Sequence, residues 1–328
     1  MEEYTISITY KRPKFYRRIF ANLIDILLFA LTFFGLFLGC RGIVISSEQY
    51  QSNQTQLIQI KKDSGIFIND KDGSLRDIIT VLNQNDSYSS SKKKIEARYG
   101  IDKFLSYTDT VCDAETAVEI RKSYDEFRLE QVVDNKPCFV LVDDQIKETG
   151  DADDLHYYKN VYAEYIDKYC QGYLIKSVPH YYDLTKYLST VLILGEITPS
   201  YLLAGIIIYL IPPIFFRRGK MTIGKALYHI GLLNNKILNP SFKTYFFRFL
   251  IFYFGELILS LFTFGLPYII SFSMMVFSKK KQGFPDYMLD LQEVDTSKDK
   301  IFNTIEEVKL DSINPSKKPV DFNVPICR

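Results

Sequence analysis

The sequence predicts an α-helical membrane bundle of three to four membrane-embedded segments, with an inserted extracytoplasmic α+β domain. The prediction rests on three long apolar blocks, on a polar region between the first two, and on basic residues beside the blocks. The blocks cover residues 19–40, 187–216 and 246–277. Each is long enough to cross a bilayer, because about 20 helical residues span a hydrocarbon core of about 30 Å.

The amino-terminal segment, residues 1–18, is predicted to lie in the cytoplasm. Five of the eight residues 11–18 are Lys or Arg, and basic residues beside a span are retained on the cytoplasmic side. The first transmembrane helix, residues 19–40, then leads outward. A signal peptide explains this segment less well, because the apolar run is too long, contains Asp25 and is not followed by a small-residue cleavage site.

Residues 41–186 are predicted to form the extracytoplasmic domain. They carry 19 Lys and Arg against 25 Asp and Glu, so the rest of the chain is net positive. Hydrophobic periodicity predicts both strands and helices in this region. The predicted elements are a hairpin over 58–70, a buried strand over 136–144, and helices over 75–84, 118–132 and 153–173.

Four tyrosines of the last predicted helix in this domain share one face: Tyr158, Tyr162, Tyr165 and Tyr169. Such an aromatic stripe forms a platform for a ligand or a membrane surface, or else the core face of the helix. The core face is the commoner arrangement, because an amphipathic helix buries its apolar stripe.

The domain also holds three of the five cysteines: Cys112, Cys138 and Cys170. In an oxidising compartment at most one disulfide can form among three thiols, and the sequence assigns no pairing. No CxxC pair is present, so a cysteine metal site is not expected.

The second apolar block, residues 187–216, is too long for one untilted span. We expect an approach segment over 187–198 and a span over 200–216. The basic residues that follow place the loop 217–245 in the cytoplasm, as a basic amphipathic segment on the membrane surface.

The third segment, residues 246–278, has basic residues at both ends and a Phe-Gly-Leu-Pro break at 264–267. A helical hairpin satisfies both features, because it returns the chain to the side from which it entered. Residues 279–328 are predicted to form a cytoplasmic tail, mostly disordered beyond Gln292.

Short sequence patterns lie beside these predicted spans. Arg18, Ala21 and Asp25 stand in the order R-x2-A-x3-D at the start of the first block, after Arg17. Arg248 lies near the start of the third block.

Two longer stretches complete the set. Residues 220–233, KMTIGKALYHIGLL, are similar to a sequence pattern of a known protein family, GQTLGKRLLGIRVV. They keep Thr222, Gly224 and Lys225 of this pattern. Residues 277–294, FSKKKQGFPDYMLDLQEV, are similar to the closing pattern of the same family, RRQGLHDLLAGTVV. They keep Gln282, Gly283 and Asp286 of this pattern.

In this order and spacing, the patterns resemble the RDD family of polytopic membrane proteins. The resemblance covers residues 10–40 and 201–294 and leaves the inserted domain unmatched. Where the family pattern has a histidine before its last aspartate, this chain has Pro285, so no role that needs this imidazole is expected.

Asp25 is the first candidate site residue, because a carboxylate in the apolar part of a span costs roughly 2.5–3.5 kcal/mol and is expected to face the bundle interior. Arg18 shares its helix face, and Asn22 can lend it a hydrogen bond. Two interpretations stand: Asp25 pins helices together by pairing with Arg18, Lys225 or Arg248, or it forms a cation or proton site, as the family's suggested transport roles imply.

Glu256, in the third block, is a second candidate carboxylate with the same two interpretations. The first predicted function is therefore transport of a monovalent cation or proton by a multi-pass protein of the cell membrane, in contact with the lipid bilayer. The alternative is a membrane-anchored scaffold or sensor whose exported domain binds a protein partner. An enzyme is the weakest class, because no nucleophile, metal or phosphate motif is visible. Neither a cofactor nor a nucleic-acid partner is expected.

Overall fold

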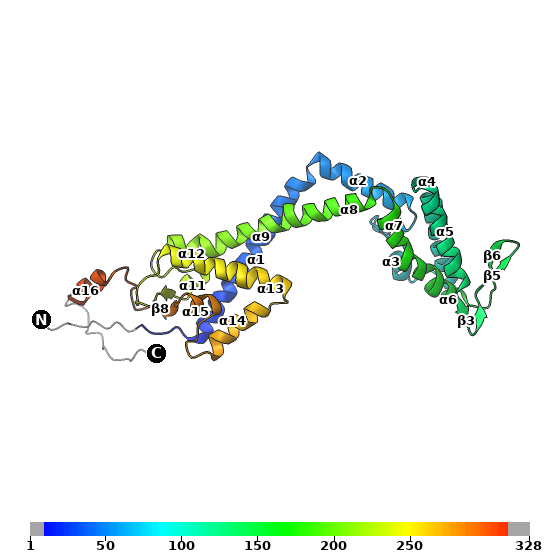
Figure 1. Cartoon of the computed structure of the whole chain (residues 1–328). Helices are drawn as coiled ribbons and strands as arrows, with labels where there is room; N and C mark the ends of the chain where they lie inside the picture. Colours follow the sequence, from blue (N-terminus) through cyan, green and yellow to red (C-terminus); the bar gives the residue numbers. More distant parts are fainter. Residues whose placement is uncertain (1–9, 314–328) are drawn as a thin grey trace. The chain divides into compact units, whose positions relative to one another are not determined.

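A computed structural model describes residues 10–313 (Figure 1). They fall into two compact units. The membrane unit comprises the described parts of Met1–Cys40 and Glu196–Arg328, and the insert unit is Arg41–Gly195. The insertion predicted over 41–186 therefore corresponds to a unit of its own.

Three helices are long and apolar enough to cross a membrane: Phe15–Ile45, Tyr181–Phe215 and Phe242–Phe262. Most of their side chains are not buried within the protein. Long apolar helices with such exposed surfaces require a lipid environment, so the chain is a membrane protein.

The three helices contain the following elements: α1 (Phe15–Ile45); α8 (Tyr181–Thr190), η3 (Val191–Ile197), α9 (Thr198–Gly205), η4 (Ile206–Leu210) and α10 (Pro212–Phe215); and α12 (Phe242–Leu250), η5 (Ile251–Ile258) and α13 (Leu259–Phe262). Residues 187–198, predicted as an approach segment, are helical and continue into the rest of the second long helix without a break. Pro199 is tolerated within it because it stands at the first turn of α9, next to the π-helical η3.

After α13 the chain reverses within the Phe-Gly-Leu-Pro stretch. Phe264 and Gly265 both have positive φ, at 51° and 82°, and Pro267 lies in the first turn of α14 (Leu266–Phe277). Helix α14 packs back against η5, and the two form a hairpin in yellow and orange in Figure 1. Gly265 adopts the left-handed conformation without a Cβ penalty, which makes the tight reversal possible.

Buried tyrosines join the second and third long helices. The hydroxyl of Tyr245 donates to the Tyr209 carbonyl, and that of Tyr253 donates to the Tyr201 carbonyl, both at 2.6 Å. A side chain at Gly205 would overlap the Tyr253 ring. A small residue at a helix interface permits the close approach that membrane helices need for packing.

The segments outside the long helices fold onto the end of this bundle. They are α11 (Ile223–Leu227), β7 (Ile230–Leu233), α15 (Phe284–Met288), β8 (Gln292–Asp295) and α16 (Ile305–Ile313). Strand β7 pairs antiparallel with β8, with Ile230 opposite Asp295 and Leu233 opposite Gln292.

This pairing corrects the prediction that the tail is mostly disordered beyond Gln292. Residues 292–295 form β8, and Val294, Ile301 and Leu233 make a small apolar cluster. Single apolar residues in a polar stretch give no local signal of order. Their partners come from β7, some sixty positions earlier in the chain, and only tertiary folding brings them together.

The insert unit is mostly helical. Its helices are α2 (Glu48–Asp63), α3 (Ile78–Gln84), α4 (Ser90–Val111), α5 (Ala114–Leu129), α6 (Asp154–His156), η1 (Tyr157–Ala163), η2 (Ile166–Cys170) and α7 (Gln171–Ser177), with α8 and η3 completing it. Its strands form three antiparallel hairpins, β1 (Phe67–Asn69) with β2 (Leu75–Asp77), β3 (Val132–Val133) with β4 (Lys136–Pro137), and β5 (Phe139–Val142) with β6 (Gln145–Glu148). The α+β prediction is therefore confirmed only in part: the unit is mostly helical, and its strands form small hairpins.

Two predictions inside this unit are wrong. The hairpin expected over 58–70 begins as helix α2, and its strand pair lies at 67–69 and 75–77. The strand expected to be buried over 136–144 is mostly exposed, with only Phe139 buried in β5. Apolar alternation marks a strand but does not say what covers it. The helices expected over 118–132 and 153–173 are confirmed within a few residues.

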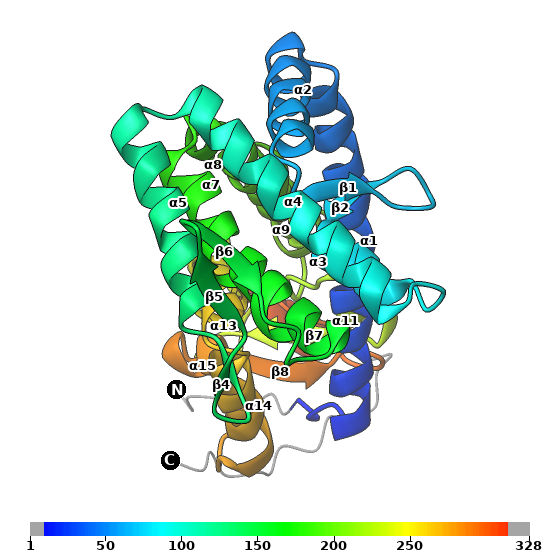
Figure 2. The same ribbon diagram turned by 90° about the vertical axis from the view of Figure 1, so that its right-hand side faces the viewer.

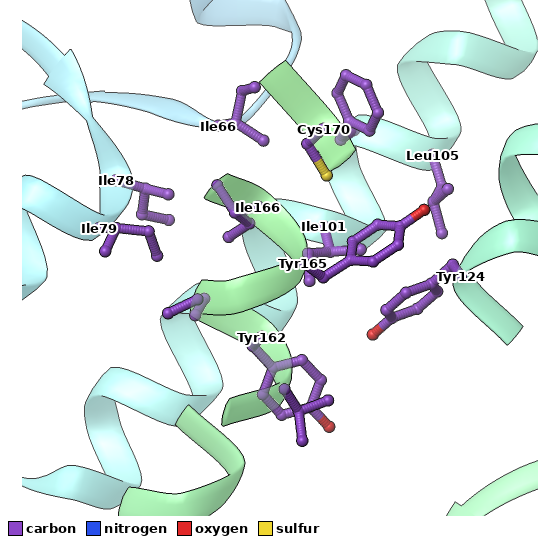
Figure 3. Packing of buried hydrophobic residues seen from close by; sticks show 14 of the residues in the cluster. Ile66, Ile78, Ile79, Ile101, Leu105, Tyr124, Tyr162, Tyr165, Ile166 and Cys170 are labelled. Atoms are coloured by element: carbon purple, nitrogen blue, oxygen red, sulfur yellow. The ribbon is translucent and has the colours of Figure 1, made fainter. Parts of the chain in front are cut away.

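The tyrosine stripe is the core face of its helix. Tyr158, Tyr162 and Tyr165 are buried, and Tyr169 is 37% exposed. Figure 3 shows Tyr162 and Tyr165 among isoleucines of α3 and α4 and Tyr124 of α5. The neighbouring helices α4 and α5 pack against each other, and in Figure 2 they diverge from the end at which the chain connects them. The platform interpretation is therefore wrong for most of the stripe.

The cysteines of the insert unit are free thiols in the structure, and Cys138 and Cys170 are buried. Burial raises the pKa of Cys138. A thiol with a raised pKa is a poor nucleophile at neutral pH, so Cys138 acts as a small apolar residue.

The core of the insert unit can be tested on α4, where Ile101 is fully buried and Ile95 is 62% exposed. We expect Ile101→Ala to lower the free energy of unfolding by about 2–5 kcal/mol, because it leaves a cavity. The matched Ile95→Ala should change it by less than about 0.5 kcal/mol. Hydrogen exchange of α4 amides in the purified protein measures both; equal effects of the two substitutions would contradict the core described above.

Candidate functional site

The buried Asp25 carboxylate of α1 fastens the first turn of α11. The Thr222 hydroxyl donates to Asp25 Oδ2 at 2.5 Å, and the Gly224 amide donates to Oδ1 at 2.7 Å. Thr222 is the N-cap of α11, so its hydroxyl also accepts from the Lys225 amide. Asp25 therefore satisfies otherwise unpaired donors at a helix start, where a negative charge is favoured.

Two small residues permit this contact. Ala21 is fully buried on the same face of α1 as Asp25, one turn earlier. A Cβ at Gly224 would overlap the carbonyl oxygen of Ala21 and lie at 3.0 Å from the Asp25 carboxyl carbon. The alanine and the glycine of the motif are thus explained by close backbone approach.

A second buried acid, Glu293 of β8, binds two cations. Arg18 Nε donates to Glu293 Oε2, and Lys225 Nζ lies 2.7 Å from Oε1. Burial raises the pKa of the Glu293 carboxyl, but the charges of Lys225 and Arg18 outweigh burial and hold that pKa well below its usual range. The three side chains tie α1, α11 and β8 into one buried network.

A third pair joins the hairpin to α15. Arg248 of α12 binds Asp286 through two bonds, from Nε to Oδ1 at 2.5 Å and from Nη2 to Oδ2 at 3.2 Å. Such a two-point pair fixes orientation as well as charge. Gly283 precedes α15, and the Ser271 hydroxyl beside it accepts the Phe284 amide at 2.9 Å.

At the edge of the network, Arg17 binds Asp295 and the Tyr228 carbonyl. Burial raises the pKa of Asp295, but hydrogen bonds from Ser297 and the ion pair with Arg17 outweigh burial and lower the pKa to about 2. Arg17 and Arg18 thus hold alternate acids of the same strand, Asp295 and Glu293. Gln282 supports the strand by donating to the Leu291 carbonyl at 2.8 Å.

A cavity of about 70 Å³ lies among these pairs, inside the membrane unit. It is large enough to hold water, because one probe sphere needs only about 10–15 Å³. Its ionisable lining residues, apart from tyrosines, are Arg18, Asp25, Lys225, Arg248, Glu256, Asp286 and Glu293.

The lining holds three cationic and four acidic side chains. Asp25, Glu293 and Asp286 each have the partners described above. Neither Asp25 nor Glu256 forms an ion pair in the described part of the chain, but both Asp25 oxygens accept hydrogen bonds, whereas Glu256, 3% exposed on η5, is left incompletely satisfied. Ser271 bonds to its carboxyl, but Glu256 Oε1 is buried and has no hydrogen-bond partner among residues 10–313.

Tyr209 shares this feature. Its hydroxyl is buried and unpaired within the described residues, and the side chain lines the same cavity. Asn22 and Tyr268 line the cavity as well. An unpaired buried acid and an unpaired hydroxyl beside a water-sized space are unusual, because buried polar groups are nearly always satisfied.

The structure thus gathers the predicted residues around one site and changes their partners. Arg18 pairs with Glu293, not with Asp25. Asn22 lines the cavity, while the described hydrogen bonds of Asp25 come from Thr222 and Gly224. Sequence reasoning missed Glu293, Asp295 and Tyr209. The first two were visible as the acids of the closing QEVD stretch, had its alternation been taken as a strand.

Among residues 10–313, no group of three or more His, Cys, Asp or Glu side chains is placed to hold a metal ion.

Comparisons with known proteins agree with the motif. The RDD family model matches residues 182–290, which confirms the resemblance for the second and third apolar blocks. The α1 motif and most of the insert unit lie outside the matched range. No curated protein and no solved structure matches the chain.

The close approach of α11 to α1 predicts a large effect of one methyl group. We expect Gly224→Ala to lower the thermal unfolding temperature of the purified protein, because the new Cβ displaces α11 from Asp25. Gly39→Ala is the control: it lies on α1 with open space around it and should be neutral or stabilise the helix by up to about 1 kcal/mol. A Gly224→Ala protein as stable as the wild type would contradict the contact.

The depressed pKa of Asp295 predicts acid sensitivity. Its contribution to stability is present above about pH 4 and is lost as the pH falls toward 2. We expect Asp295→Asn to lower the free energy of unfolding by about 1–2 kcal/mol at pH 7 and to approach the wild type near pH 2. Denaturant titrations at both pH values measure this; a difference that does not shrink in acid argues against it, and the exposed Asp299→Asn is the control.

Proposed function

We propose that the chain, whose residues 182–290 match the RDD family, is a multi-pass membrane protein that transports a proton or a monovalent cation. One observation carries the proposal: among the acids that line a cavity inside the membrane unit, Glu256 is the one that has neither an ion pair nor a partner for its buried Oε1 within the described residues. An unpaired carboxylate at such a depth is costly, so Glu256 holds a proton or binds a cation.

The arrangement separates two roles. Asp25, Glu293 and Asp286 are fully engaged and hold α11, β8 and α15 in position. Glu256 Oε1 and the Tyr209 hydroxyl remain available to a water molecule, a proton or a cation. Sequence alone favoured Asp25 as the exchanging group, but its two oxygens already accept hydrogen bonds. The proposal therefore assigns exchange to Glu256 and positioning to Asp25.

The proposed topology follows from the basic residues beside the spans. Residues 1–18 and 279–328 lie in the cytoplasm of a cell-membrane protein, and residues 41–186 lie outside. The paired arginines and lysine then sit at the cytoplasmic end of the bundle, and a proton from the cytoplasm reaches Glu256 through the cavity. Pro285 lines this cavity in place of the histidine of the family pattern, so no imidazole takes part there.

The test is proton flux into vesicles that contain the purified protein, followed with a pH-sensitive dye under gradients of Na⁺ or K⁺. We expect Glu256→Gln to lower the flux by about 100-fold, the effect typical of removing a proton-transfer group, with little loss of folded protein. The exposed Glu306→Gln should leave the flux unchanged. Asp25→Asn should lower flux only in proportion to the folded protein it loses. Wild-type flux in Glu256→Gln would refute the assignment.

A second function is favoured by the insert unit. Arg41–Gly195 has its own core of buried residues and forms a compact unit. A folded domain of this size on two membrane helices suits a scaffold or sensor that binds a protein partner outside the cell. This becomes the better explanation if wild-type vesicles show no flux of protons or cations.

A further inference from the structure

A second cavity in the membrane unit lies where two apolar helices end. Its volume is about 340 Å³, within the range of small-molecule sites, about 300–1,000 Å³. Phe15, the first residue of α1, lines it, together with Met275 near the end of α14. Because α14 is apolar up to Phe277 and three lysines follow it, and because Arg17 and Arg18 stand at the start of α1, the cavity is expected at the boundary between the hydrocarbon and polar regions of a membrane.

The lining of this cavity is strongly basic. Four cations line it, Arg12, Arg18, Lys280 and Lys281, against one carboxylate, Glu293. Arg18 is neutralised by Glu293, and Lys280 lies 3.2 Å from the exposed Asp290. Arg12 and Lys281 have no acidic partner among residues 10–313. Two positive charges therefore face the cavity uncompensated.

Gln282 adds a second and independent indication of a ligand. Its Nε2 donates to the Leu291 carbonyl, but Oε1 is buried and has no partner within the described chain. The side chain is 5% exposed and lines the cavity. A ligand that carries both an anionic group and a hydroxyl would pair with the free cations and with this acceptor.

The surface beside the cavity is apolar and aromatic. Phe15 is 44% exposed and its ring lies tilted against that of Phe272, with ring centroids 6.3 Å apart, and Phe277 is 84% exposed. Exposed aromatic side chains at the membrane boundary accommodate acyl chains next to a headgroup. A free anion would use the cations but not this surface.

We propose that this cavity binds the headgroup of an anionic phospholipid. The phosphodiester lies between Arg12 and Lys281, a headgroup hydroxyl donates to Gln282 Oε1, and an acyl chain follows Phe15 and Phe272. Basic pockets beside membrane helices bind anionic headgroups in this way, because the lipid surface supplies both charge and apolar chains. The site is separate from the Glu256 cavity and does not depend on transport.

The experiment uses the full-length protein in neutral detergent and measures lipid binding by native mass spectrometry and by thermal unfolding. Phosphatidylglycerol is compared with phosphatidylcholine of the same chains, and with inorganic phosphate and glycerol phosphate as soluble anions. We expect phosphatidylglycerol to bind and to raise the unfolding temperature, and phosphatidylcholine and both soluble anions to bind much more weakly.

Removing both free cations, Arg12→Gln with Lys281→Gln, should weaken phosphatidylglycerol binding by about 30-fold, the loss expected for two basic residues at an anionic lipid surface. The matched control is Lys236→Gln with Lys243→Gln, which removes two exposed cations of the same unit. If the double variant does not fold, Lys281→Gln alone serves. Unchanged binding by the variant, equal binding of phosphatidylcholine, or equal binding of inorganic phosphate would overturn the proposal.

Discussion

The membrane unit depends on the hydrogen bonds that Asp25 accepts from the start of α11. A carboxylate inside an apolar helix must be satisfied, and Asp25 meets this constraint with a hydroxyl and a backbone amide from a segment about 200 positions later. The contact draws α11 against α1, which places Lys225 beside Glu293 and so positions β8.

Ion pairs or hydrogen bonds satisfy three of the four acids that line the smaller cavity, and Glu256 keeps one oxygen without a partner in the described residues. Arg18, Lys225 and Arg248 meet Glu293 and Asp286 directly. Breaking one of these pairs would leave a buried charge without a partner, at a cost of about 3–5 kcal/mol. Glu256 has no such partner in the described residues, although it shares a cavity with all of them.

The two cavities of the membrane unit differ in their lining residues. The smaller cavity is enclosed by paired charges and offers an acid and a hydroxyl. The larger one offers free cations beside exposed aromatic rings. Arg18 and Glu293 line both, so the two cavities lie next to each other at the ion pair between α1 and β8. The two proposals consequently rest on different residues, Glu256 and Tyr209 in one case and Arg12 and Lys281 in the other.

The sequence by itself determined the apolar helices, the insertion between the first two, and many of the residues around the smaller cavity, because hydropathy and short motifs are local properties; it did not indicate Glu293, Asp295 or Tyr209. Only the tertiary structure decided their partners: Arg18 holds Glu293, and Asp25 holds a backbone amide. It also showed that residues 292–295 form a strand and that residues 187–198 continue a helix. A buried charge in a membrane protein is stabilised by a partner of opposite charge or by hydrogen bonds. Because this partner can come from any position in the chain, one sequence does not show which residue it is.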